Sequence, residues 1–146
     1  MGPQRFLEQA ILLARQNVTE KGGRPFGAVV VRNGEIIATG TNDVLKTNDP
    51  TDHAEMKAIR EACCKLGREF LSDCEIYASG EPCPMCQGAI RWADIKAVYY
   101  ASPREKAAES QIMPRGKNEN IPFQYIEMKS GAEPFDLWVK RKINIK

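Results

Sequence analysis

Residues 74–101 read CEIYASGEPCPMCQGAIRWADIKAVYYA, and this stretch decides the fold class because strand and helix patterns alternate along it. Cys74 to Ser79 and Ile95 to Ala101 are rich in β-branched and aromatic residues, which predicts two strands. Pro84 to Ala93 predicts a short helix between them. A strand–helix–strand crossover joins parallel strands, so the stretch indicates an α/β protein.

The residues before this stretch continue the alternation. Arg5 to Glu20 carries apolar residues at helical spacing and is followed by a pair of glycines, which predicts a helix. Pro25 to Val31 and Ile36 to Thr41 flank an Asn-Gly hairpin signal, which predicts two antiparallel strands. A polar loop then leads to strong helix formers from His53 to Leu66, which predict a helix.

The C-terminal part of the chain is less regular. Ser102 to Asn120 is charged and predicts a loop with one helical turn. Pro122 to Met128 alternates as an edge strand does, and Phe135 to Lys142 predicts a terminal helix.

Length and composition indicate one globular domain over residues 1–146. The 146 residues are 42% hydrophobic and 27% charged, which allows burial of about two thirds of the unfolded surface. The formal net charge of +2 is too small to require a nucleic-acid or membrane partner. No stretch approaches the roughly 18 apolar residues of a membrane span, and the N-terminus does not resemble a signal peptide. We therefore expect a cytoplasmic protein without a membrane partner.

Two short motifs combine the residue types of a catalytic metal site. His53-Ala54-Glu55 is followed by Pro82-Cys83-Pro84-Met85-Cys86, an order typical of zinc deaminases. Zinc binds imidazole nitrogen and thiolate sulfur, and a catalytic site supplies three protein ligands and leaves a fourth position to water. His53, Cys83 and Cys86 therefore predict one zinc ion per chain.

The two cysteines of the second motif have alternatives. Cysteines three apart share one face of a helix, and a helix N-terminus stabilises their thiolates. A structural zinc site or a redox pair is the alternative. A closed structural site needs a fourth Cys or His, whereas the chain has one His. Cys63, Cys64 and Cys74 fall within apolar patterns that are typical of buried thiols.

Glu55 is the predicted proton carrier. Zinc lowers the pKa of a water, and a neighbouring carboxylate can take the proton and deliver one to a departing amine. Residues two apart do not face each other on a regular helix, so His53 and Glu55 require an irregular helix start, with Thr51 or Asp52 as N-cap. The alternative is a capping box formed by Asp52 and Glu55, in which Glu55 only binds the main chain.

Five residues are candidates for contact with a ring-shaped substrate, namely Phe26, Asn42, Ala54, Glu81 and Trp92. Core packing is the alternative for the aromatic residues Phe26 and Trp92. Glu81 precedes the metal-binding turn, where a capping or solvated role is the alternative.

The chain resembles the cytidine deaminase-like superfamily, with its guanine deaminase branch the most similar. Four stretches carry the resemblance: Pro25 to Val29, Asn48 to Glu55, Glu81 to Ala93 and Ile121 to Phe123. The resemblance implies a three-layer α/β/α sandwich with a five-stranded mixed β-sheet. It also implies a homodimer. In the guanine deaminase branch, the two subunits exchange their C-terminal segments. Phe26 and Asn42 resemble the base-contacting aromatic and asparagine of that family, and Trp92 resembles a further pocket residue.

One segment departs from the guanine deaminase pattern. That branch carries a longer acidic insert that holds the guanine N–H edge, whereas Glu105, Glu109 and Glu119 do not reproduce it. Buried polar contacts dominate discrimination between similar rings. We therefore expect a small nucleobase-like substrate, with guanine converted to xanthine as the leading hypothesis.

Several other functions stay open. Cytosine, guanosine, an aminotriazine or a tRNA adenosine are alternative substrates. A nucleic-acid partner is disfavoured because residues 40–56 lack a basic cluster. A zinc-stabilised binding module without catalysis is the alternative class, and it would have no need of Glu55.

Overall fold

The computed structural model describes residues 2–110 and 120–144. The chain divides into two compact units, residues 1–116 and 117–146, each of which is described by itself. Among the described residues, no helix combines the length and the apolar character needed to cross a membrane. The single domain over residues 1–146 stays a prediction.

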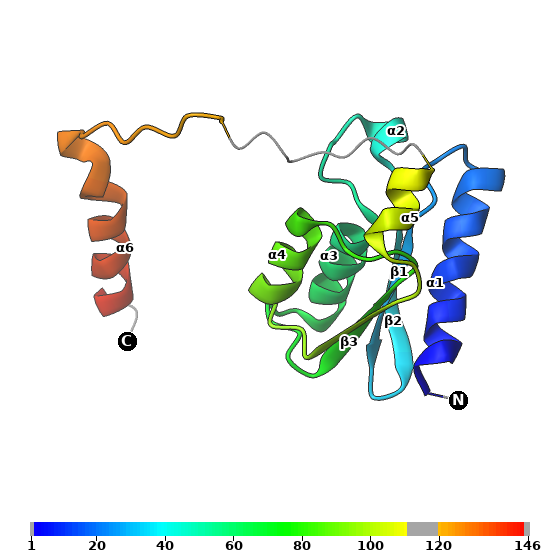
Figure 1. The fold of residues 1–146 in the computed structure, drawn as a ribbon. Coiled ribbons are helices and arrows are strands. Elements are labelled where there is room, and N and C mark those ends of the chain that lie inside the picture. Colours follow the sequence, from blue (N-terminus) through cyan, green and yellow to red (C-terminus); the bar gives the residue numbers. More distant parts are fainter. Residues whose placement is uncertain (1, 111–119, 145–146) are drawn as a thin grey trace. The chain divides into compact units, whose positions relative to one another are not determined.

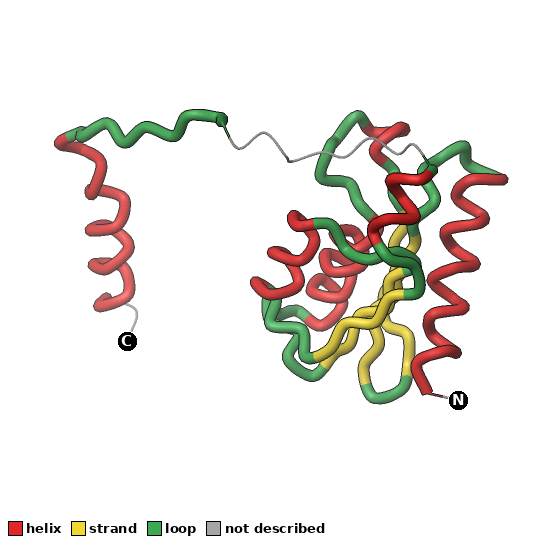
Figure 2. The backbone as a smooth tube through the Cα atoms, in the orientation of Figure 1, coloured by secondary structure: helices red, strands yellow, loops and turns green. Residues whose placement is uncertain are grey.

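The first unit is built on a mixed four-stranded sheet with the order β2-β1-β3-β4 (Figures 1 and 2). The strands are β1 (Gly27–Arg32), β2 (Glu35–Thr41), β3 (Cys74–Ala78) and β4 (Ala97–Tyr100). β1 runs antiparallel to both β2 and β3, and β3 runs parallel to β4. The predicted hairpin and the predicted parallel crossover are thus both confirmed.

Helices cover both faces of this sheet, as Figure 1 shows. The helices of the first unit are α1 (Gly2–Thr19), α2 (Val44–Thr47), α3 (Ala54–Leu66), α4 (Pro84–Trp92) and α5 (Arg104–Glu109). Val29 and Val31 pack with Phe6 of α1 on one face. Val30, which alternates with them, packs with Ala58 of α3 on the other face. The alternation of side chains along β1 therefore produces the three layers.

Two glycines allow the helices to lie close against the sheet. A Cβ on Gly27 of β1 would overlap the main-chain oxygen of Ala10 in α1. A Cβ on Gly40 of β2 would overlap the main-chain oxygen of Ala54 in α3. The first turn of α3 is thereby held directly over the end of β2.

The predicted fifth strand is wrong. Pro122 to Met128 has no strand assignment, and Phe123 is 93% exposed. A strand requires a neighbour that accepts its main-chain hydrogen bonds, and the alternating pattern alone does not supply one. The described elements of the second unit are the 3₁₀ helix η1 (Lys129–Ala132) and α6 (Glu133–Asn144), which contains the predicted terminal helix.

The predicted loop over residues 102–120 contains one short helix, α5, in its first part. The predicted single helical turn is therefore confirmed there. Residues 111–119, which include Glu119, lie outside the described residues.

Candidate metal centre

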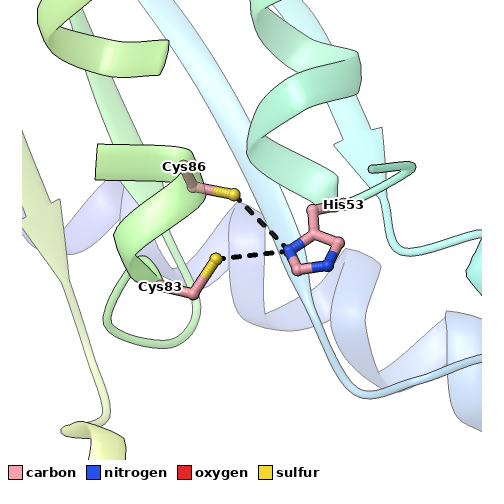
Figure 3. A group of neighbouring side chains, drawn as sticks. All are labelled: His53, Cys83 and Cys86. Atoms are coloured by element: carbon pink, nitrogen blue, oxygen red, sulfur yellow. Dashed lines mark hydrogen bonds between the residues drawn. The ribbon is translucent and has the colours of Figure 1, made fainter. Parts of the chain in front are cut away.

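Two helix starts bring three metal-ligating side chains together. His53 is the N-cap of α3, Cys83 is the N-cap of α4, and Cys86 lies in the first turn of α4. The Nδ1 atom of His53 lies 3.5 Å from each cysteine sulfur. Figure 3 shows both sulfurs and this nitrogen pointing toward one another. All three ligand atoms lie within 4.8 Å of one another, so one ion can contact all of them.

This donor set suits zinc. One imidazole and two thiolates are ligands that Zn²⁺ prefers, and three protein ligands leave a coordination position open. No fourth His, Cys, Asp or Glu of the described chain joins the group. His53 and Cys83 are half-buried and Cys86 is buried, so two of the three ligands remain partly accessible to solvent. The geometry therefore fits an open metal site better than a closed structural site.

In the metal-free group, the pKa values of the two thiols shift in opposite directions. The hydrogen bond from Cys86, followed by that from His53, lowers the pKa of Cys83 to about 3. The neighbouring Cys83 sulfur raises the pKa of Cys86 and also that of His53. The remaining protons must leave when a metal binds, so metal affinity is expected to rise with pH.

The local sequence explains why α4 begins where it does. Cys83 has an extended backbone, and Pro84 follows at the first helical position, where a missing N–H is not lost from the helix. The main-chain N–H of Gln87 bonds the oxygen of Cys83 at 2.8 Å, and its side chain bonds the oxygen of Pro82 at 2.9 Å. These bonds fix the turn that presents both sulfurs.

The start of α3 corrects one prediction. The N-cap is His53, not Thr51 or Asp52, and α3 begins at Ala54. The capping box is absent because Asp52 is outside the cap position and its carboxylate accepts a 3.0 Å hydrogen bond from Thr47. His53 on the extended backbone and Glu55 in the first turn can therefore both lie beside the metal group.

Glu55 is buried next to the metal ligands, with 7% of its surface exposed. Burial, and then the charge of Cys83, raises the pKa of Glu55 to about 7. A carboxyl group with such a pKa can accept and donate a proton at neutral pH. This environment matches a proton carrier rather than a solvated surface acid.

Asn42 and Phe26 lie together at the edge of the same region. The main-chain N–H of Asn42 bonds the oxygen of Phe26 at 3.2 Å. The side-chain oxygen of Asn42 accepts a 3.1 Å bond from the N–H of Val44, which fixes the orientation of its amide. The amide nitrogen of Asn42 donates to no residue in the described parts of the chain, although only 3% of Asn42 is exposed.

Phe26 and Ala54 differ in their access to a ligand. Phe26 is half-buried and packs partly against the core, with its ring beside Gly80. Ala54 is completely buried in the first turn of α3. Contacts of these residues with a substrate stay predictions.

Glu81 and Trp92 occupy other surroundings. One carboxylate oxygen of Glu81 accepts a 3.0 Å bond from the main-chain N–H of Arg104, and its own N–H bonds Ser102 at 2.7 Å. Glu81 therefore anchors the segment that follows β4. Trp92 is 87% exposed and lines a hollow with Ile59 and other residues of α3 and α4, which includes none of the three metal ligands. Substrate contacts by both residues stay predictions.

Sequence reasoning missed two residues that organise the loop before His53. Asp43 forms an ion pair with Lys57 of α3, and its main-chain N–H bonds Asp52 at 3.0 Å. Asn17 is completely buried at the end of α1. Its polar side chain on the apolar face of a predicted helix was the available signal.

Proteins of known function place the chain in a family. The cytidine and deoxycytidylate deaminase zinc-binding region matches residues 2–102. Guanine deaminase of Bacillus subtilis (strain 168) is 45% identical over 94% of both chains. A tRNA-specific adenosine deaminase of Aquifex aeolicus (strain VF5) is 42% identical over 99% of this chain and 98% of its own.

A solved structure agrees with this assignment. The X-ray structure of guanine deaminase from Bacillus subtilis matches with a TM-score of 0.86 and 44% identity, covering 100% of this chain and 98% of that one. The predicted resemblance is thereby confirmed, and so is the α/β fold, with four strands in place of five. The family description and the converging donors both support zinc as the metal. The chain belongs to the cytidine and deoxycytidylate deaminase family, and it carries the zinc-binding region of that family.

Proposed function

We propose that this chain is a zinc-dependent hydrolytic deaminase that converts guanine and water to xanthine and ammonia. The observation that carries the proposal is the buried Glu55 beside the converging His53, Cys83 and Cys86. The similarity to guanine deaminase over 94% of both chains supports guanine as the ring. We propose one zinc ion per chain, held by His53, Cys83 and Cys86.

The residues of the chain supply the proton transfers. Zinc, when bound, supplies a Lewis acid that lowers the pKa of a water molecule. The Glu55 carboxylate accepts the proton that the water loses as the C–O bond forms, and it delivers this proton to the adjacent ring nitrogen. It then transfers the remaining hydroxyl proton to the exocyclic amine, the C–N bond breaks, and ammonia leaves. The pKa of about 7 suits both transfers, because neither proton-bound nor proton-free Glu55 is strongly disfavoured at neutral pH.

Asn42 and Phe26 are the proposed contacts to the ring. The fixed orientation of the Asn42 amide leaves its N–H₂ group free to donate to a ring nitrogen or carbonyl. The half-buried ring of Phe26 offers an apolar face beside it. We also propose a substrate contact for Ala54, which lies between His53 and Glu55 in the sequence.

The assembly is proposed to be a cytoplasmic homodimer with exchanged C-terminal segments. Exposed apolar side chains support a further buried surface, because a monomer rarely leaves several of them in water. In α6, Phe135 is 73% exposed and Leu137 is 65% exposed. In the first unit, Tyr100 of β4 is 48% exposed.

A second candidate function is deamination of a tRNA adenosine. The 42% identity to a tRNA-specific adenosine deaminase over 99% of the chain favours it. Guanine is preferred because the small net charge of +2 offers little attraction for a polyanion.

Release of ammonia from a panel of substrates tests the proposal. Zinc-loaded protein is incubated with guanine, guanosine, cytosine, adenine, ammeline and a tRNA anticodon hairpin. We expect ammonia from guanine, and no release after zinc is removed with a chelator. Preferential release from the hairpin would favour the tRNA function. Absence of release from every compound would refute both proposals.

A further inference from the structure

Asn17 is a buried polar residue in an otherwise apolar interface. It lies near the C-terminal end of α1, on the face that also buries Phe6, Ala10 and Ala14. None of its surface is exposed. Asparagine is a poor helix former, and burial of its amide is costly without hydrogen bonds. The position therefore requires an explanation beyond packing.

Both hydrogens of the Asn17 amide are used to hold other segments. The amide nitrogen donates to the main-chain oxygen of Arg24 at 2.8 Å and to that of Asn42 at 2.8 Å. Arg24 and Asn42 are joined through Phe26, whose N–H bonds Arg24 at 2.8 Å and whose oxygen accepts from Asn42 at 3.2 Å. One side chain thus ties together the entry to β1 and the exit from β2.

Packing shows that the amide fills a space shaped for it. A Cβ on Gly23 would lie 2.5 Å from the Asn17 amide nitrogen, so a larger residue there would displace the amide. The Asn17 side-chain oxygen is buried and has no hydrogen-bond partner. An unpaired buried acceptor destabilises the fold, whereas an apolar side chain of the same branching would bring no such acceptor into the interface. The Asn17 amide therefore acts through its two donated hydrogen bonds and not through its oxygen.

The segment that Asn17 holds at Asn42 continues directly to the metal group. Asn42 precedes Asp43, whose N–H bonds the oxygen of Asp52, the residue before His53. The side-chain oxygen of Asn42 is held by Val44, which leaves its amide nitrogen as a nearly buried donor. The placement of this donor depends on where the main chain of Asn42 is fixed.

We infer that Asn17 is a positioning residue for substrate binding: its amide fixes the main chain of Asn42 so that the Asn42 N–H₂ group meets the substrate ring. The inference rests on the proposed deaminase function for its kinetic consequence. The main-chain tie itself is independent of that function. Asn17 does not touch the substrate.

A double-mutant cycle separates positioning from general stability. Asn17→Leu keeps the same branched side-chain skeleton, is somewhat larger and has no donors, and Asn42→Ala removes the proposed ring contact. We expect Asn17→Leu to raise the KM for guanine about tenfold with kcat changed less than about threefold, as for one lost hydrogen bond to the ring. In the Asn42→Ala background the same change should raise KM less than about twofold.

Phe6→Leu is the matched control, because Phe6 is buried on the same helix and packs against Tyr77, away from Asn42. It should lower stability and leave KM unchanged. Hydrogen exchange provides a readout that needs no activity. The main-chain amides of Arg24, Phe26 and residues 42–44 should exchange faster in Asn17→Leu and not in Phe6→Leu.

Equal KM effects of Asn17→Leu with and without Asn42 would overturn the inference. Unchanged exchange of both segments would also overturn it, even if the protein proved inactive on guanine. Wild-type inactivity on guanine together with the expected exchange pattern would refute only the proposed substrate.

Discussion

Replacement of Glu55 by glutamine should separate activity from stability. Glutamine keeps the shape of the side chain but never ionises, so it removes both proton transfer and the buried charge. We expect Glu55→Gln to bind zinc as the wild type does. Its kcat should fall by about 10²–10⁴, the usual contribution of general acid–base catalysis.

The stability change follows from the burial of Glu55. Burial raises its pKa from 4.5 to about 7, and this difference corresponds to about 3 kcal/mol. A group with a raised pKa in the folded state stabilises the fold least where it is ionised. The ionised Glu55 therefore does not destabilise the fold below about pH 4, destabilises it increasingly between about pH 4 and 7, and has its full effect above that range. Glutamine does not ionise, so the variant lacks this destabilisation at every pH.

Urea unfolding of metal-free wild type and Glu55→Gln at pH 5 and pH 8 measures this difference. We expect the variant to be more stable by up to about 3 kcal/mol at pH 8 and by less than about 1 kcal/mol at pH 5. Zinc content and ammonia release are measured on the zinc-loaded proteins. Full activity of the variant, or an equal stability difference at both pH values, would refute the assigned role and environment of Glu55.

Two other substitutions test the framework of the site. Gly40→Ala places a Cβ against Ala54, so it should displace α3, lower the free energy of unfolding by about 1–3 kcal/mol and reduce activity. Gly88→Ala is the control, because open space surrounds Gly88 in α4, and a gain of about 1 kcal/mol is expected in urea unfolding. A stable, active Gly40→Ala protein would contradict the close packing. The hydrogen bond from Arg32 holds the pKa of Asp73 far below its usual range, so this stabilisation begins to be lost below about pH 4 and is lost completely only in much stronger acid. Asp73→Asn should therefore be less stable than wild type at pH 6, and this difference should narrow only as the pH falls from about 4 toward about 2. A difference that widens at low pH would exclude this explanation.

The pairing of two strands could be predicted from the sequence where a short connection joins them. The hairpin of β1 and β2 and the crossover from β3 to β4 both have short connections that specify their pairing. Pro122 to Met128 shows the same alternation but has no strand assignment. Alternation of apolar and polar residues indicates that a segment has two different faces. It does not indicate which strand, if any, pairs with the segment through main-chain hydrogen bonds.

The site was predictable where spacing along one helix determines geometry. Cys83 and Cys86 are three residues apart at a helix start, which places both sulfurs on one face. The N-cap of α3 was not predictable, because Asp52 is held by Thr47 inside a loop whose path depends on tertiary contacts. Asn17 was missed for a similar reason, since its partners lie 7 and 25 residues away.

We expect the choice of ring to depend in part on residues outside the region that matches the family. Relatives named for guanine and for tRNA adenosine are 45% and 42% identical to this chain, so overall identity does not separate the two substrates. The family match ends at residue 102, after both helix starts that carry the metal ligands. The bond from Arg104 to Glu81 then fixes the direction in which the chain leaves that region. Buried polar contacts discriminate between rings, so we expect substitutions beyond this bond to change the substrate without changing the proton transfers proposed for Glu55.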